Sequence, residues 1–299
     1  MTYNKDTFGY WWTVIEKMPD ISNKDYVGNI DCQYVGMKSL KGAPKLVDGD
    51  FFCSNNNLST LEGAPKIVNG YFSCSNNNLS SLKGAPQEVG GFRCELNSKL
   101  TSLMFGPKIV KGDYISGGCG LKDIKGSPKI IGGYFICANN HVKSLVGGPQ
   151  EVKEKYNCNS NDLTSLEGAP KSCTVFNCSY NTIKTLKDLP KKINELECYD
   201  TDIISLDGCP KVLDKLDCSS CKNLTSLKGI PELIKGTLNC KNTPKLKSLD
   251  ELLGTEVKGH IYSDLSIKEF KEDQKLYIKV HKNLSKYKKL KKLLQATKT

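Results

Sequence analysis

The chain has 299 residues, of which 38% are hydrophobic, and this is enough apolar material to bury a core and to exclude disorder of the whole chain. Its net charge of +11 is uneven, because Ser266 to Thr299 hold eleven Lys against only three acidic residues. Arg93 is the single arginine, which excludes base or phosphate recognition by guanidinium groups as the main activity. No window approaches the roughly 18 apolar residues of a membrane span, and the first residues lack the pattern of a signal peptide. We therefore expect reduced cysteines and a cytoplasmic protein.

The first predicted element is an N-terminal cap over residues 1–30. It contains the aromatic segment TFGYWWTVIEKMP, from Thr7 to Pro19, which is predicted to form a helix laid over the unit that follows. Trp11 and Trp12 are interpreted as packing residues of this cap, and a ligand platform is the alternative.

A repeat occupies the middle of the chain, over residues 31–262. Ten prolines recur at steps of 20 or 21 residues, at Pro44, Pro65, Pro86, Pro107, Pro128, Pro149, Pro170, Pro190, Pro210 and Pro231. A cysteine recurs with the same period, and Ser116 fills the one gap: Cys32, Cys53, Cys74, Cys94, Cys137, Cys158, Cys178, Cys198, Cys218 and Cys240. A period of this length indicates a solenoid of eleven coils, in which each coil buries its apolar edge against its neighbours.

Within a coil, a large apolar residue precedes the cysteine by two positions, as Phe51 precedes Cys53. This alternation with polar residues predicts a short strand with one buried face. Asparagine follows the cysteine by three positions in six coils, as at Asn56, and its amide is predicted to satisfy backbone groups of a turn and to form a ladder. Glycine precedes the cysteine by four positions in six coils, as at Gly70, where we expect an unusual backbone angle.

The repeat resembles the leucine-rich repeat, L-x-x-L-x-L-x-x-N-x-L, in the short form seen in bacterial effectors of the YopM and IpaH kind. The segments LPKKINELECYDTDIISLDGCP and CPKVLDKLDCSSCKNLTSLKGIP are most similar to it. The resemblance covers about Asp31 to Tyr262 and implies a β-rich α/β solenoid, an arc of about 11–12 coils with a parallel sheet on its concave face. The chain departs from the family by placing Phe or Tyr where Leu usually begins the strand, which predicts a wider buried spine.

Catalytic and metal sites are not predicted, and neither is a cofactor. His141, His260 and His281 lie at positions that the repeat does not bring near a matching acid. Cys218 and Cys221 have the C-x-x-C spacing of a zinc site, but the repeat gives both a structural place and no second pair accompanies them. The ubiquitin-ligase domain that follows the repeats in the IpaH relatives does not carry over, since only about 40 residues follow the last coil and none is Cys.

The last predicted element is a Lys-rich amphipathic helix over residues 263–299. It opens with a capping box from Ser266 to Glu269 and has apolar residues at steps near three and four. Three interpretations stay open: a cap on the last coil, a partner or self-association helix, and binding to nucleic acid or an anionic membrane.

The outward strand positions are the candidate binding surface. They are Phe52, Tyr71, Arg93, Ile115, Tyr134 and Ile136 in the N-terminal half, followed by Glu195, Glu197, Tyr199 and Asp217 in an acidic C-terminal half. Exposed aromatic residues beside charges favour a protein partner, although isolated apolar residues also simply suit strands. We therefore predict a non-catalytic protein-recognition solenoid, a bacterial or phage factor that acts on a host protein, with no nucleic-acid or membrane partner. The alternative is nucleic-acid or anionic-membrane binding through the Lys-rich helix.

Overall fold

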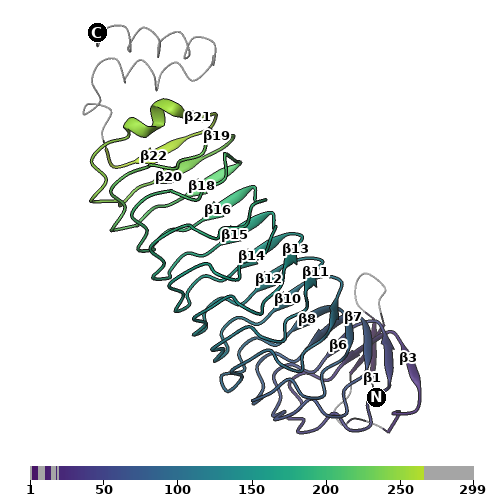
Figure 1. Cartoon of the computed structure of the whole chain (residues 1–299). Helices are drawn as coiled ribbons and strands as arrows, with labels where there is room; N and C mark the ends of the chain where they lie inside the picture. The colour runs from purple at the N-terminus through teal and green to yellow at the C-terminus, as the bar shows by residue number, and fades with distance from the viewer. Residues whose placement is uncertain (1, 6–10, 15–17, 19, 266–299) are drawn as a thin grey trace, which may run out of the picture.

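The computed structural model describes residues 2–5, 11–14, 18 and 20–265, and over this range the chain forms a solenoid of stacked coils (Figure 1). Most coils contribute two short strands, which pair with the same two strands of the next coil in parallel. This arrangement confirms the parallel β-solenoid that the repeat predicts. The only helix in the described ranges is the 3-10 helix η1 (Asp250–Gly254) near the C-terminal end of the stack.

The first strands of the coils begin shortly after the prolines. They are β3 (Asp25–Val27), β5 (Leu46–Asp48), β9 (Ile109–Val110), β11 (Ile130–Ile131), β13 (Glu151–Val152), β17 (Val212–Leu213), β19 (Leu233–Ile234) and β21 (Glu256–Val257). The second strands contain the large residue before the cysteine. They are β4 (Asn29–Asp31), β6 (Phe51–Phe52), β10 (Tyr114–Ile115), β12 (Phe135–Ile136), β14 (Lys155–Asn157), β15 (Val175–Asn177), β16 (Glu195–Glu197), β18 (Lys215–Asp217), β20 (Leu238–Cys240) and β22 (Ile261–Ser263). In two coils, β7 (Ile67–Ser73) and β8 (Glu88–Arg93) run through both positions.

The register of the second strands places equivalent residues directly beside one another. Phe51 pairs with Phe72, Phe72 with Phe92, and Tyr114 with Phe135. Because side chains alternate across a strand, every coil therefore sends the same positions inward and the same positions outward. The outward surface is consequently a set of continuous columns along the solenoid.

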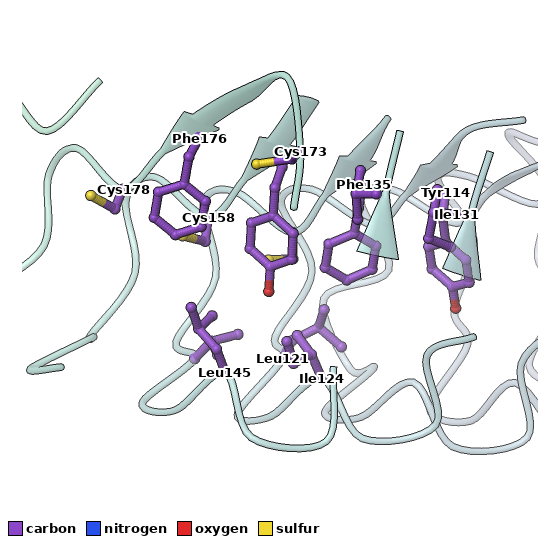
Figure 2. Packing of buried hydrophobic residues seen from close by; sticks show 14 of the residues in the cluster. Tyr114, Leu121, Ile124, Ile131, Phe135, Leu145, Cys158, Cys173, Phe176 and Cys178 are labelled. Atoms are coloured by element: carbon purple, nitrogen blue, oxygen red, sulfur yellow. The ribbon is translucent and has the colours of Figure 1, made fainter. Parts of the chain in front are cut away.

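An aromatic spine forms the core beneath the second strands. Consecutive ring centroids lie 5.1–5.9 Å apart along seven residues: Phe51, Phe72, Phe92, Tyr114, Phe135, Tyr156 and Phe176. Figure 2 shows Tyr114, Phe135 and Phe176 pointing from the strands toward Leu121, Ile124 and Leu145 of the return segments. The wider buried spine predicted from the sequence is therefore present, and it continues as Leu196, Leu216 and Leu238 in the C-terminal coils.

The predicted asparagine ladder is confirmed. In its own coil, the amide nitrogen of Asn77 donates to the carbonyl of Cys74 at 3.1 Å, and it also donates to Cys53 of the preceding coil at 3.0 Å. Its side-chain oxygen accepts the backbone N–H of Leu58 at 2.9 Å. One buried side chain thus satisfies the polar groups of two turns, which is the reason that the position recurs.

The cysteines form a second ladder. The thiol of Cys53 donates to the carbonyl of Ser73 in the next coil at 3.3 Å, and Ser116 makes the same contact to Ile136 at 3.2 Å with its hydroxyl. All fourteen cysteines are free. Burial raises the pKa of thirteen of them, to about 12 at Cys137, so they stay protonated and unreactive at neutral pH. Only Cys119 differs, because a hydrogen bond with Cys94 lowers its pKa.

The expectation of an unusual backbone angle at the recurrent glycine is wrong in most coils. Gly49 has a φ of 155°, but Gly70, Gly112 and Gly236 do not have a positive φ. A side chain at Gly70 would instead meet the carbonyl oxygen of Gly49 at 2.7 Å, and one at Gly236 would meet that of Asp214 at the same distance. In these coils the close approach of the neighbouring coil, and not the backbone angle, favours glycine at this position.

The predicted N-terminal helix is also wrong where the chain is described. Trp11–Val14 form strand β2, which pairs antiparallel with β1 (Thr2–Lys5) and parallel with β4. Aromatic and β-branched residues favour a strand, and the edge of β4 has free backbone groups that a strand can satisfy. The C-terminal amphipathic helix cannot be compared in this way, because residues 266–299 lie outside the described range.

Candidate partner-binding surface

The strand face is the outward surface of the second strands together with the residue that follows each cysteine position. Its central column contains Phe52, Arg93, Ile115, Ile136, Glu197 and Asp217, and one flanking column contains Tyr71, Tyr134 and Glu195. Tyr199 lies in the other flanking column. The structure therefore brings all ten residues predicted from the sequence onto one face of the solenoid.

Tyr71 and Arg93 form a fixed cluster at the N-terminal end of the strand face. The Tyr71 ring lies over Gly91 of the next coil, and its hydroxyl donates to the carboxylate of Asp113, two coils away, at 2.8 Å. The guanidinium carbon of Arg93 lies 5.2 Å from the centre of the Tyr71 ring. Burial raises the pKa of Tyr71, and the hydrogen bond with Asp113 raises it further. The cluster is consequently set in place before any partner arrives.

Apolar side chains lie between this cluster and the middle of the face. Ile115 pairs with Arg93 on one side and with Ile136 on the other, and both isoleucines are half-buried. Tyr134 is 41% exposed, and a hydrogen bond with Glu154 raises the pKa of its hydroxyl. Phe52 is half-buried in the coil of Cys53. These residues form a modest apolar area with a tyrosine at its edge.

Glu197 is the centre of an ion network in the C-terminal half. Its carboxylate accepts Lys155 Nζ at 3.0 Å, Lys215 Nζ at 3.3 Å and the amide of Asn177 at 2.7 Å. Burial favours a higher pKa for Glu197, but the hydrogen bonds and charges of Lys155 and Lys215 outweigh it, and the pKa is lowered. The carboxylate is therefore neutralised within the face and does not present a free negative charge.

The remaining predicted residues have different environments. Tyr199 packs edge-on against Tyr180, with ring centroids 5.2 Å apart. Asp217 accepts the hydroxyl of Ser219 at 2.6 Å and the amide of Asn239 at 3.1 Å. Glu195 makes no salt bridge with any residue of the described range, and it lies beside Lys215 in the strand register. The acidic half predicted from the sequence is thus a mixed, hydrogen-bonded surface.

Sequence reasoning missed a row of exposed side chains at the edge of the strand face. The residue two positions after each cysteine has a positive φ in every coil, and in several coils it is Asn, such as Asn55. Large side chains occupy this strained position at Tyr34, Leu96 and Tyr180, which are 78%, 60% and 50% exposed. The sequence contains a signal for this row, because the position two residues after the cysteine is often Asn and is a bulky residue in three coils.

Replacing these bulky residues by the asparagine of other coils should stabilise the protein. Left-handed backbone costs non-Gly residues free energy, and it costs Asn less than most. We expect Leu96→Asn to raise the free energy of unfolding by about 0.5–1 kcal/mol in urea denaturation. Asn139→Leu is the matched reverse change and should lower it by a similar amount; stabilisation by both changes would contradict this account.

The histidines and cysteines of the described residues are the side chains with the greatest capacity for metal binding or nucleophilic chemistry. Within that part of the chain there is no group of three or more His, Cys, Asp and Glu that could hold a metal ion. Cys221 instead occupies the asparagine position, and its thiol donates to the carbonyl of Cys198 at 3.2 Å. The prediction that the repeat brings no matching acid near His141 is wrong, because equivalent positions of adjacent coils are neighbours: His141 is exposed, and its Nδ1 lies 3.5 Å from the carboxylate of Asp162. None of the helices among the described residues has the length and apolar character needed to cross a membrane.

Comparison with known proteins gives one structural similarity. No family model matches the chain, and no curated protein matches it. Among solved structures, YopM from Yersinia enterocolitica WA-314 matches with a TM-score of 0.40 and 16% sequence identity. The match covers 78% of this chain and 65% of YopM, so less than two thirds of that protein is spanned.

Proposed function

We propose that this chain is a non-catalytic recognition solenoid of the short leucine-rich-repeat kind that binds a protein partner through the strand face. The observation that supports it best is the pre-ordered set of side chains on that face. Tyr71 is held by Asp113, Glu197 by two lysines, and Tyr199 by Tyr180. Side chains that are ordered before binding lose little conformational entropy on association, which favours a protein interface.

The charge of the strand face indicates the kind of partner. Counting the outward positions from Asn29 to Asp264, eight carboxylates face four basic residues: Asp31, Asp50, Glu95, Asp113, Glu195, Glu197, Asp217 and Asp264 against Arg93, Lys155, Lys215 and Lys241. A net negative surface repels nucleic acid and attracts a basic protein surface. The proposed partner is therefore a protein with exposed Lys or Arg near an apolar centre. Within the same proposal, the chain is a bacterial or phage product and the partner is a host protein.

Binding should depend on Tyr134 and Glu195, because both are accessible and neither belongs to an internal salt bridge in the described range. We expect Tyr134→Ala to weaken the complex about tenfold or more, since interface tyrosines often contribute over 1 kcal/mol. Glu195→Lys reverses a charge beside Lys215, and it should weaken the complex further because the new lysine repels the basic surface of the partner. Co-purification of the tagged full chain from candidate host cells, quantified by mass spectrometry, identifies the partner, and titration with the purified partner measures the change.

Phe105→Ser is the matched control, because Phe105 is 64% exposed but lies on a turn away from the strand face. The proposal requires that the partner be lost with the two face variants and kept with the control. Equal recovery of the partner by all three proteins would exclude the strand face as the binding surface. Glu197→Lys is less informative, because it would also break the network with Lys155 and Lys215.

A further inference from the structure

A second charged surface lies on the side of the coils formed by the first strands. The residue directly after the proline is lysine in seven of ten coils: Lys45, Lys66, Lys108, Lys129, Lys171, Lys191 and Lys211. We call this set the lysine row. Its backbone is stacked from coil to coil, with Lys66 N–H donating to Lys45 O at 2.8 Å and Lys108 N–H to the carbonyl of Gln87 at 2.9 Å. The seven lysines therefore follow one line along the solenoid.

The lysine row is exposed and mostly not neutralised. All seven side chains are exposed, and in the described part of the chain only Lys211 has a salt bridge, with Glu232 at 3.1 Å. Counting the first, second and fourth residues after each proline, this side holds eleven lysines and five carboxylates. Three of those carboxylates are already paired with lysines of the same side, at Glu88, Asp214 and Glu232. The charge is thus opposite to that of the strand face.

Exposed aliphatic side chains lie directly beside the row. Ile109 and Ile130, which follow Lys108 and Lys129, are 52% and 56% exposed, and Val212, which follows Lys211, is 44% exposed. The pairing of Ile131 with Val110 makes Ile109 and Ile130 neighbours across adjacent coils. Nucleic-acid sites use basic residues with aromatic rings on which bases stack, whereas basic residues with aliphatic neighbours are typical of membrane-surface binding.

We propose that the lysine row attaches this protein to an anionic membrane surface. The ammonium groups would contact lipid phosphates and carboxylates, while Ile109 and Ile130 would enter the headgroup region between them. The row extends over eight coil steps of about 4.8 Å, so a line of about 40 Å can engage several headgroups at once. This differs from the expectation of no membrane partner drawn from the sequence, and it leaves the strand face free for a protein.

The first test is co-sedimentation of the full chain with phosphatidylcholine vesicles that contain or lack phosphatidylserine. We expect binding only to the anionic vesicles, weakened by salt. Lys66→Gln/Lys108→Gln/Lys129→Gln should lower the partition coefficient about 100-fold, since each lysine near such a surface contributes roughly fivefold. The control is Lys122→Gln/Lys143→Gln/Lys184→Gln, which removes the same charge from exposed residues of the return segments.

Both triple variants have the same net charge and the same residues 266–299. A difference between them therefore reports the contribution of the lysine row alone. Equal effects of the two triple changes, or no binding to anionic vesicles at low salt, would overturn the proposal. Ile109→Thr/Ile130→Thr keeps all charges and β-branching, and should lower vesicle binding about tenfold through the lost apolar contact. If this change has no effect while the lysine-row variant loses single-stranded DNA binding, the ligand is nucleic acid and the membrane assignment is wrong.

Discussion

The protein is expected to unfold cooperatively as the pH rises from about 9 to about 10, because its core is lined with protonated thiols. Burial raises the pKa of thirteen cysteines, to about 12 at Cys32, Cys137, Cys173 and Cys209. In the unfolded chain a thiol has a pKa of about 8.5. Above that pH the unfolded state releases protons that the folded state retains, so stability present below pH 8.5 is lost as the pH rises.

The size of this effect follows from the number of thiols. Each thiol whose folded pKa lies well above the pH contributes about 1.4 kcal/mol of destabilisation per pH unit above its unfolded pKa, so the thirteen together contribute at most about 18 kcal/mol per unit. A folded protein is typically stable by about 5–15 kcal/mol, so a rise of about one pH unit above 8.5 is sufficient to unfold it. Circular dichroism against pH, with a reducing agent present, measures the transition.

Ser116 provides the control, because it shows that a hydroxyl fits the thiol position. For the triple variant Cys53→Ser/Cys158→Ser/Cys198→Ser, the slope of the free energy of unfolding against pH should fall by about a quarter. For the same stability at pH 7, its midpoint of alkaline unfolding should lie at a higher pH. A slope unchanged by the three substitutions would show that the thiols do not cause the transition.

Asn161→Ala should produce a large loss of stability for a single change of the ladder. The amide of Asn161 donates to the carbonyls of Cys137, Cys158 and Asn159 at 3.0–3.1 Å, and its oxygen accepts the N–H of Val142 at 2.9 Å. Alanine leaves these four backbone groups without their partner in a buried turn. Since each unsatisfied group costs about 1–3 kcal/mol and some will find water, we expect a loss of about 3–5 kcal/mol in urea denaturation.

Two further substitutions serve as controls for Asn161→Ala. Thr201 occupies the same position in its coil and donates to Cys198 at 2.7 Å, so Asn161→Thr should keep part of the stability. The side-chain oxygen of Asn159, in the same coil, has no partner, so Asn159→Ala should be close to neutral. A loss below about 1 kcal/mol for Asn161→Ala, or an equal loss for Asn159→Ala, would contradict the ladder account.

The sequence by itself determined the solenoid, the inward spine and the asparagine ladder. Each coil stacks on coils of the same pattern. An alternation such as Phe51 and Cys53, once it is repeated in every coil, therefore determines which side chains point into the core. The sequence also placed the ten candidate residues on one face, because alternation along a strand decides which side chains point outward. Local spacing is sufficient for all of these features.

Only the tertiary structure decided which outward side chains are tied to others. Tyr71 reaches Asp113 across two coils because Gly91 between them leaves room for its ring, and Lys155 reaches Glu197 across two coils because its side chain is long. Trp11–Val14 form a strand because they pair with the open edge of β4. The sequence pattern of residues 7–19 alone does not show that this edge is available. The period of a repeat specifies where backbones lie, whereas the pairing of charges and rings depends on contacts between coils, and these differ at each position along the stack.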